Sequence, residues 1–203
     1  MRILAVSDEE SESLWSGHVK DIARGVDIIV SCGDLRNEYL EFLLTMINVP
    51  LLYVFGNHDE SGPEGGICID GRVYEFEGVR FLGLGGSMRY RQGKNMYSES
   101  EMRWRYFRAL PGIWRKGGID ILVTHAPAKG FGDLDDRAHR GFGIFNAIMR
   151  KYRPKYMLHG HVHKAYGRFR KEHIHDAGTV ILNVCGYKII ETALKKRPTP
   201  TRS

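Results

Sequence analysis

Short apolar runs that end in polar, glycine-containing turns recur along the first third of the chain. Residues 2–6, 27–31 and 51–55 are such runs, rich in β-branched and aromatic side chains. This length and composition are typical of buried strands. Between the second and third runs, leucine and isoleucine recur at helical spacing over residues 37–48. A strand, a helix and a strand in succession predict a parallel pair of strands.

The rest of the chain alternates between further strand-like runs and two amphipathic segments. Strands are predicted at residues 72–76, 79–84, 119–124, 156–163, 166–171 and 178–184. Helices are predicted at residues 98–110 and 143–152, and the second must end before Pro154 because proline cannot continue a helix. No internal repeat or low-complexity linker divides the chain, so we expect one α/β domain over residues 1–194.

Composition restricts the class of protein. Of the 203 residues, 42% are hydrophobic and 11% aromatic, which is enough for the core of a single domain. No apolar run approaches the ~18 residues of a membrane span, so we expect no membrane association. The first residues lack the apolar segment of a secretory signal. Three cysteines without CxxC spacing suit a reducing compartment, and the sequence therefore predicts a cytoplasmic protein.

The charge balance is basic. Thirty Lys and Arg against 24 Asp and Glu give a net charge of +6. This favours anionic partners such as phosphorylated metabolites or nucleic acid. Part of the excess lies in residues 195–203, where charge and two prolines predict a disordered tail.

Polar side chains of the metal-binding type follow most of the predicted strands. They are Asp8, Asp34, Asn57, His58, His125, His161 and His163. Ligand sites of α/β folds collect where strands end, so we expect these side chains to converge. In an extended segment alternate side chains point the same way, so His161 and His163 can face one metal site while Val162 packs on the opposite side. Nitrogen and oxygen ligands suit Mn²⁺, Zn²⁺, Fe or Co, and two such ions suit a hydrolytic centre.

Each signal by itself also has a purely structural explanation. A Gly-Asn-His-Asp turn is commonly only a turn, and an aspartate after a strand can simply cap a helix. His125 can be a loop histidine with ordinary hydrogen bonds, and His161 and His163 can occupy the exposed face of an edge strand. The order of five such signals, each at a strand end, favours the metal site.

In this order the residues resemble the calcineurin-like metallophosphoesterase superfamily, whose pattern reads D-x-H, GD, GNH[DE], H and GHxH. The resemblance implies an α/β fold in which two mixed β-sheets pack face to face with helices on the outer faces. It also implies two divalent metal ions, with Mn²⁺ preferred and Zn²⁺, Fe or Co as alternatives. By position, the implied ligands are Asp8, Asp34 and His163 for one ion and Asp34, Asn57, His125 and His161 for the other. Asp34 would bridge the ions, and His58 would be the catalytic histidine.

The chain departs from this pattern at one position. Glu10 stands where the pattern has its first histidine. We expect Glu10 to supply an oxygen ligand to the first metal, because Asp8 and Glu10 are two residues apart at a strand end. An additional carboxylate would favour harder ions such as Mn²⁺. The alternative is a solvated or helix-initiating carboxylate.

Two long connections after strands carry candidate substrate-binding residues. Structureless connections of this length are usually functional or disordered. In residues 87–97, Arg89 is the predicted phosphate-binding group, because a guanidinium grips phosphate oxygens through two hydrogen bonds. In residues 126–141, His139 is either a surface histidine or part of the pocket. Residues 101–115 interleave arginines with aromatic residues, which favours an amphipathic helix and leaves nucleic-acid binding as the alternative.

These observations predict a metal-dependent phosphoesterase. Two dications lower the pKa of a bridging water toward ~7, and the resulting hydroxide can attack phosphorus. His58 would protonate the leaving oxygen. We expect a phosphodiester or a small phosphorylated molecule as substrate. The alternatives are a non-catalytic interaction scaffold on the same fold, which Glu10 favours, and a nuclease, which the basic charge favours. The sequence leaves the oligomeric state open.

Overall fold

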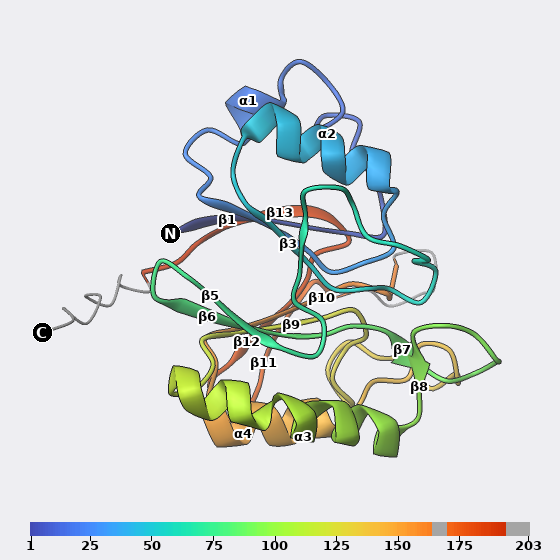
Figure 1. Cartoon of the computed structure of the whole chain (residues 1–203). Coiled ribbons are helices and arrows are strands. Elements are labelled where there is room, and N and C mark those ends of the chain that lie inside the picture. Colours follow the sequence, from blue (N-terminus) through green and yellow to red (C-terminus); the bar gives the residue numbers. More distant parts are fainter. Residues whose placement is uncertain (164–169, 194–203) are drawn as a thin grey trace, which may run out of the picture.

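Two β-sheets packed face to face form the centre of this computed structural model, which describes residues 1–163 and 170–193 (Figure 1). The first sheet consists, in spatial order, of β13 (Gly186–Glu191), β1 (Arg2–Ser7), β2 (Ile28–Ser31), β3 (Leu51–Tyr53) and β4 (Ile67–Cys68). The four strands from β1 to β4 are parallel, and β13 runs antiparallel to β1. The predicted parallel pairing of the second and third strands is therefore confirmed.

The second sheet is also mixed. It consists, in spatial order, of β11 (Glu172–Ile174), β12 (Val180–Asn183), β10 (Tyr156–His159), β9 (Ile121–Thr124), β6 (Val79–Leu84) and β5 (Val73–Phe76). Its four central strands are parallel, whereas β11 and β5 pair antiparallel at the two edges. Two short strands, β7 (Ser87–Met88) and β8 (Met96–Tyr97), form a separate small sheet.

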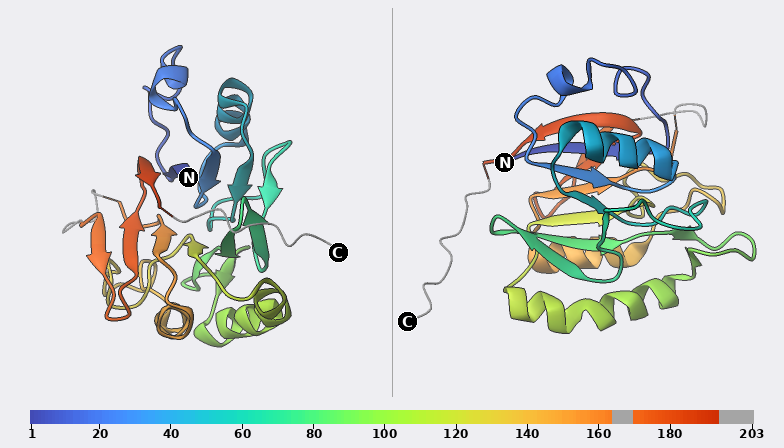
Figure 2. Two further views of the ribbon diagram at one scale, coloured as in Figure 1. Left: turned by 90° about the vertical axis from the view of Figure 1, so that its left-hand side faces the viewer. Right: turned by 45° about the horizontal axis from the view of Figure 1, so that its top comes forward.

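Helices cover the outer faces of both sheets (Figure 2). Helices α1 (Val19–Ile22) and α2 (Asn37–Ile47) lie on the first sheet, and α3 (Glu99–Lys116) and α4 (Gly143–Tyr152) lie on the second. The core between the sheets is apolar and fully buried at positions such as Ile3, Val30, Phe81, Val123 and Leu158. The predicted fold of two mixed sheets with helices outside is confirmed.

Helix α3 is longer than predicted. Its start is fixed by a capping box, in which Ser98 and Glu101 exchange side-chain to backbone hydrogen bonds. It then runs through Pro111, which lies on the exposed face, and ends at Gly117, whose φ of 74° suits glycine. The expected stop at residue 110 is wrong because the buried Ile113 continues the apolar stripe past the proline.

The outer face of α3 exposes large aromatic side chains. Trp104, Phe107 and Trp114 are 63%, 50% and 65% exposed, while Met102 and Tyr106 are buried against the sheet. Residues 101–115 therefore lie within the amphipathic helix that was predicted, and nucleic-acid binding by this face stays the untested alternative. Among the described residues, no helix is long and apolar enough to cross a membrane.

The predicted strand at residues 156–163 is only partly confirmed. β10 ends at His159, and His161 has a φ of 68°, which is left-handed and incompatible with an extended strand. The expected alternation of side chains along an extended strand therefore does not explain the positions of His161 and His163. Most of the predicted strand 166–171 and the predicted tail 195–203 lie outside the described residues, and β11 begins at Glu172.

Candidate metal centre

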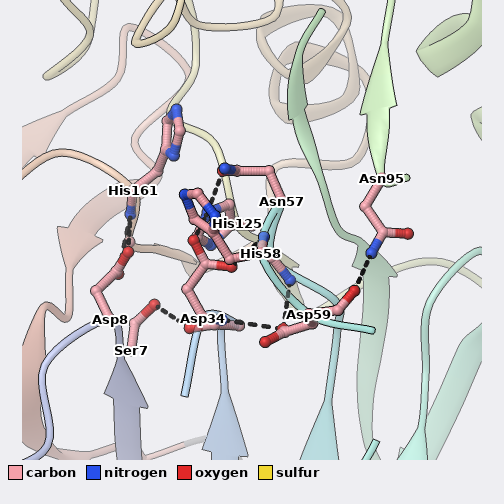
Figure 3. Close-up of polar contacts among 12 residues, drawn as sticks. Ser7, Asp8, Asp34, Asn57, His58, Asp59, Asn95, His125 and His161 are labelled. Atoms are coloured by element: carbon pink, nitrogen blue, oxygen red, sulfur yellow. Dashed lines mark hydrogen bonds and ion pairs between the residues drawn. The ribbon is translucent and has the colours of Figure 1, made fainter. Parts of the chain in front are cut away.

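The carboxyl ends of strands from both sheets meet at one end of the molecule. Asp8 follows β1, Asp34 lies beyond β2, Asn57 beyond β3, His125 directly after β9 and His161 beyond β10. Figure 3 shows these side chains gathered in one place, with His58 beside them. The convergence that the sequence predicts is therefore present in the fold, and both sheets contribute to it.

Three of these residues have left-handed backbone conformations, which are unfavourable for residues other than glycine. Asp8, Asp34 and His161 have φ values of 62°, 56° and 68°. Such conformations cost of order 1 kcal/mol or more and cluster at functional sites. Local hydrogen bonds offset the cost, because the backbone N–H of His161 donates to both oxygens of Asp8, at 3.1 and 3.0 Å.

Two glycines let backbone segments pass close to the aspartates. A Cβ atom on Gly56 would lie 2.0 Å from Oδ1 of Asp34. A Cβ atom on Gly160 would lie 2.0 Å from Oδ2 of Asp8. Any side chain at either position would push a carboxylate out of the site. The glycines of the GNHD and GHxH segments are therefore required by packing against the two carboxylates.

The inner part of the site is a buried group of carboxylate, amide and imidazole. One ligand atom each of Asp34, His125 and His161 lie within 4.8 Å of one another. Nε2 of His125 lies 3.2 Å from Oδ2 of Asp34 and 3.1 Å from Oδ1 of Asn57. The other ring nitrogen, Nδ1, lies 2.8 Å from the carbonyl oxygen of Cys32. A backbone carbonyl at this position fixes the ring and leaves Nε2 for the site.

The charges of this inner group depend on one another. Burial alone would lower the pKa of His125, but the charge of Asp34 and the hydrogen bond to it raise that pKa to about 9. Burial opposes ionisation of Asp34 too, yet His125 lowers the pKa of this carboxyl to about 2. Burial lowers the pKa of His161 to about 3, which keeps that imidazole neutral. At neutral pH the metal-free site therefore holds the ionised Asp34 carboxylate against a protonated His125, with the neutral imidazole of His161 beside them. A divalent cation bound at Nε2 of His125 would replace its proton, because a histidine ligand must be neutral.

A second carboxylate and imidazole pair borders the inner group. Oδ1 of Asp8 lies 3.2 Å from Nε2 of His163, and the Asp8 side chain is only 1% exposed. Burial opposes ionisation of Asp8, but the hydrogen bond from His163 lowers the pKa of the carboxyl. A pocket of about 450 Å³ opens over both groups. It is lined by Asp8, Asp34, Asn57, His58, Tyr90, Ala138, His139, His161 and His163.

Glu10 is not brought into this cluster. Its carboxylate accepts hydrogen bonds from Nε and Nη2 of Arg36, at 2.7 and 2.6 Å. Nε1 of Trp15 donates to it as well, at 2.7 Å. Glu10 is absent from the described lining of the pocket. The structure therefore gives no support to the expected ligation by Glu10, because the guanidinium of Arg36, the N-cap residue of α2, already neutralises its charge.

Arg89 is directed elsewhere as well. Its guanidinium donates to Oε1 of Glu101 at 2.8 Å and to the carbonyl oxygen of Met96 at 3.2 Å. The carboxylate that caps α3 thus holds the arginine expected to bind phosphate. The next residue, Tyr90, lines the pocket instead, and so does His139, whose Nδ1 lies 3.0 Å from Asp136.

Two contributions were not foreseen from the sequence. Oδ2 of Asp59 accepts the backbone N–H groups of Asp34 and Gly56, at 3.0 and 2.7 Å, and so fixes the turn that presents Asn57. Its place at the end of the Gly-Asn-His-Asp segment was the signal for this role. In addition, Cys185 lies close to Glu9 and His163, with one ligand atom of each within 4.8 Å of the others. No spacing motif pointed to Cys185.

Comparison with known proteins agrees with this geometry. The family described as "Calcineurin-like phosphoesterase superfamily domain" matches residues 1–188. UPF0046 protein T07D4.2 of Caenorhabditis elegans is 40% identical over 70 residues, which is 34% of this chain and 16% of that protein. Metallophosphoesterase domain-containing protein 1 of Homo sapiens is 36% identical over 53 residues, which is 25% of this chain and 16% of that protein. The matched stretches are thus a small part of these relatives.

Solved structures share the fold at low sequence identity. One covers 93% of this chain and 94% of its own, with a TM-score of 0.67 and 15% identity. The crystal structure of TT1561 of Thermus thermophilus covers 91% of this chain and 89% of its own, with a TM-score of 0.62 and 15% identity. With the family pattern matched over nearly the whole chain and the donor cluster in place, this chain belongs to the calcineurin-like phosphoesterase superfamily.

Proposed function

We propose that this protein hydrolyses a phosphodiester or a small phosphorylated molecule with the help of two divalent metal ions. The observation that carries the proposal is the convergence of two aspartates, an asparagine and several histidines below one open pocket. Carboxylate, amide and imidazole donors in this number fit divalent ions such as Mn²⁺, Zn²⁺, Fe²⁺ or Co²⁺. A purely structural cluster of this kind would bury charge without a benefit to stability.

The residues divide into two groups around Asp34. Asn57, His125 and His161 would hold one ion together with Asp34, and Asp8 and His163 would hold the other beside it. Bound there, the ions would activate water as the nucleophile and polarise the phosphate. Asp8 and Asp34 are held ionised by their histidine neighbours, so both carboxylates are available to an ion.

We assign His58 the role of assisting the leaving group. Its backbone N–H donates to Oδ1 of Asp34 at 2.8 Å, which fixes the residue against the centre. Its side chain is exposed and lines the pocket. An imidazole at this place can donate a proton or a hydrogen bond to a departing oxygen, a contribution typically worth ~10²–10⁴ in rate.

The substrate pocket favours a small molecule. A volume of about 450 Å³ falls within the range of small-ligand sites. The phenol of Tyr90 and the imidazole of His139 border it and can donate to phosphate oxygens. Arg89 is left out of this role because Glu101 holds it. The alternatives, a scaffold and a nuclease, require a binding surface beyond this pocket.

Hydrolysis assays with defined metals test the proposal. Purified protein, freed of metal with a chelator, is supplied with Mn²⁺, Zn²⁺ or Co²⁺ and given a generic phosphomonoester and a generic phosphodiester. We expect hydrolysis only when metal is restored. Metal binding without hydrolysis of either ester would support the scaffold. A preference for nucleic acid, with binding that weakens steeply as salt rises, would support the nuclease.

A further inference from the structure

A carboxylate, an imidazole and a thiol meet at the outer side of the candidate centre. Ligand atoms of Glu9, His163 and Cys185 all lie within 4.8 Å of one another. They come from three separate parts of the chain, because Glu9 follows β1, His163 follows β10 and Cys185 immediately precedes β13. The antiparallel pairing of β13 with β1 and a bridge between Ser7 and Cys185 bring the thiol to this position.

We propose that Cys185, as a thiolate, binds a divalent ion together with Glu9 and Nδ1 of His163, at the outer edge of the centre. This inference goes beyond the proposed function, because Asp8 faces the other ring nitrogen, Nε2, and the His163 ring would lie between the two sites. Cysteine, histidine and carboxylate are the side chains that hold Zn²⁺ in proteins. A thiolate also shifts preference from Mn²⁺ toward Zn²⁺ and Co²⁺.

The contacts of His163 tie this group to the centre. On one side, Nε2 of its ring lies 3.2 Å from Oδ1 of Asp8. On the other, Nδ1 lies 3.5 Å from Oε1 of Glu9. One imidazole therefore stands between Asp8 and the group that contains the thiol. An ion on the Nδ1 side of this ring would have the Glu9 carboxylate, the imidazole and the Cys185 thiol as neighbours.

Burial and access also fit a ligand. Cys185 is only 5% exposed, so its sulfur is shielded from bulk solvent. A second pocket of about 280 Å³ opens beside it, bordered among others by Glu9, Lys171 and Tyr187. A coordinated divalent ion deprotonates a thiol, so Cys185 would bind as the thiolate.

Cobalt substitution tests the thiolate directly. A cysteine thiolate bound to Co²⁺ gives a near-ultraviolet charge-transfer band, which nitrogen and oxygen ligands do not give. We expect this band in the Co²⁺-loaded full chain and its loss in Cys185→Ser. Cys68→Ser is the matched control, because Cys68 lies in the edge strand β4, and it should keep the band. A band that persists in Cys185→Ser would overturn the proposal.

Affinity and direct sulfur detection complete the test. Zn²⁺ affinity at one of the bound equivalents should fall at least tenfold in Cys185→Ser and in Glu9→Gln. X-ray absorption of the zinc-loaded unmodified chain needs no variant, and it should show sulfur at about 2.3 Å, at less than one sulfur per zinc because the signal averages over all bound ions. A zinc shell of nitrogen and oxygen alone would overturn the assignment even if Cys185→Ser fails to fold.

The outcomes separate this inference from the proposed function. Hydrolysis without a sulfur ligand would leave the phosphoesterase proposal intact and remove the role of Cys185. A sulfur ligand without hydrolysis would establish the thiolate site and contradict the phosphoesterase. A chain that binds no divalent metal would contradict both.

Discussion

The two carboxylate oxygens of Glu10 are held by Arg36, with 2.7 Å to Nε and 2.6 Å to Nη2 of the guanidinium. Arg36 is the N-cap residue of α2, so the ion pair joins the loop after β1 to the start of this helix. The chain departs from the family pattern at Glu10, and the structure gives that residue a partner outside the metal centre. Two variants that differ in position by one residue test this assignment.

Replacing Glu10 with alanine should leave the metal content unchanged, whereas Glu9→Ala should weaken one ion. The ion pair is partly exposed, with Arg36 at 69%, so its loss should cost only about 1 kcal/mol of unfolding free energy. Metal analysis and urea denaturation of both variants measure these effects. Loss of an ion from Glu10→Ala would show that Glu10 is a metal ligand and contradict this assignment.

The same pair predicts a pH dependence of stability. The hydrogen bond from Arg36 lowers the pKa of Glu10 below its ordinary value of 4.5. A carboxyl with a lowered pKa stabilises the fold fully above its ordinary value, and the contribution is lost as pH falls through the folded-state value. The stability difference between the unmodified chain and Glu10→Ala should therefore be constant from pH 7 to about 5 and shrink at lower pH. A difference that grows on acidification contradicts the ion pair.

His58→Ala should lower kcat by about 10²-fold or more while both ions remain bound. The reason is that His58 contacts Asp34 through its backbone N–H, which alanine retains, and only the pocket-facing imidazole is lost. Turnover and metal content measured on the same preparation separate the two roles. If an ion is lost with the imidazole, His58 is itself a ligand.

Gly160→Ala should damage the centre through Asp8. The added Cβ would lie 2.0 Å from Oδ2 of Asp8 and 2.1 Å from Oγ of Ser7, so the carboxylate must move. We expect weaker metal binding and a lower midpoint of thermal unfolding. Gly112→Ala is the control, because nothing lies within 4 Å of its Cβ and the position is helical, so stability should rise by about 0.5–1 kcal/mol. Normal metal binding by Gly160→Ala would show that the approach of the two backbones is not required.

Asp120→Ala should destabilise the second sheet by about 3–5 kcal/mol, because it leaves the buried charge of Arg80 without its carboxylate. Arg80 is 7% exposed and donates to both oxygens of Asp120, at 2.7 and 2.6 Å. Glu75→Ala removes a more exposed pair with Lys116 and should change stability by less than about 1 kcal/mol. Equal effects of the two variants, read from urea denaturation, would contradict this difference.

Much of the centre could be predicted because parallel strands carry their carboxyl ends to one edge. Asp8, Asp34 and His125 follow strands whose apolar runs are plain in the sequence, so local pattern was enough to gather them. The position of His161 in the site has a different structural cause from the extended strand that was expected. A left-handed turn after β10 places it, and the N–H of this residue bonds Asp8, a contact between residues 153 positions apart.

Other features depend on tertiary contacts that no local pattern records. Arg36 forms an ion pair with Glu10, and Glu101 forms one with Arg89, because the fold brings residues of opposite charge together. No local pattern links Cys185 to Glu9 or His163, and it is the pairing of β13 with β1 that brings these residues together. Strands of two residues, such as β4, are likewise too short for a hydrophobic period to indicate them.

The measurement that tests the account most directly is the metal content and phosphodiester turnover of Asp34→Asn beside those of the unmodified chain. Asp34 lies against His125 at 3.2 Å and binds the backbone of His58, so it stands at the centre of the proposed site. We predict at least two divalent ions per unmodified chain, the loss of at least one in the variant, and a fall in turnover of about 10²-fold or more. An Asp34→Asn variant that keeps the full metal content and normal turnover would contradict the account.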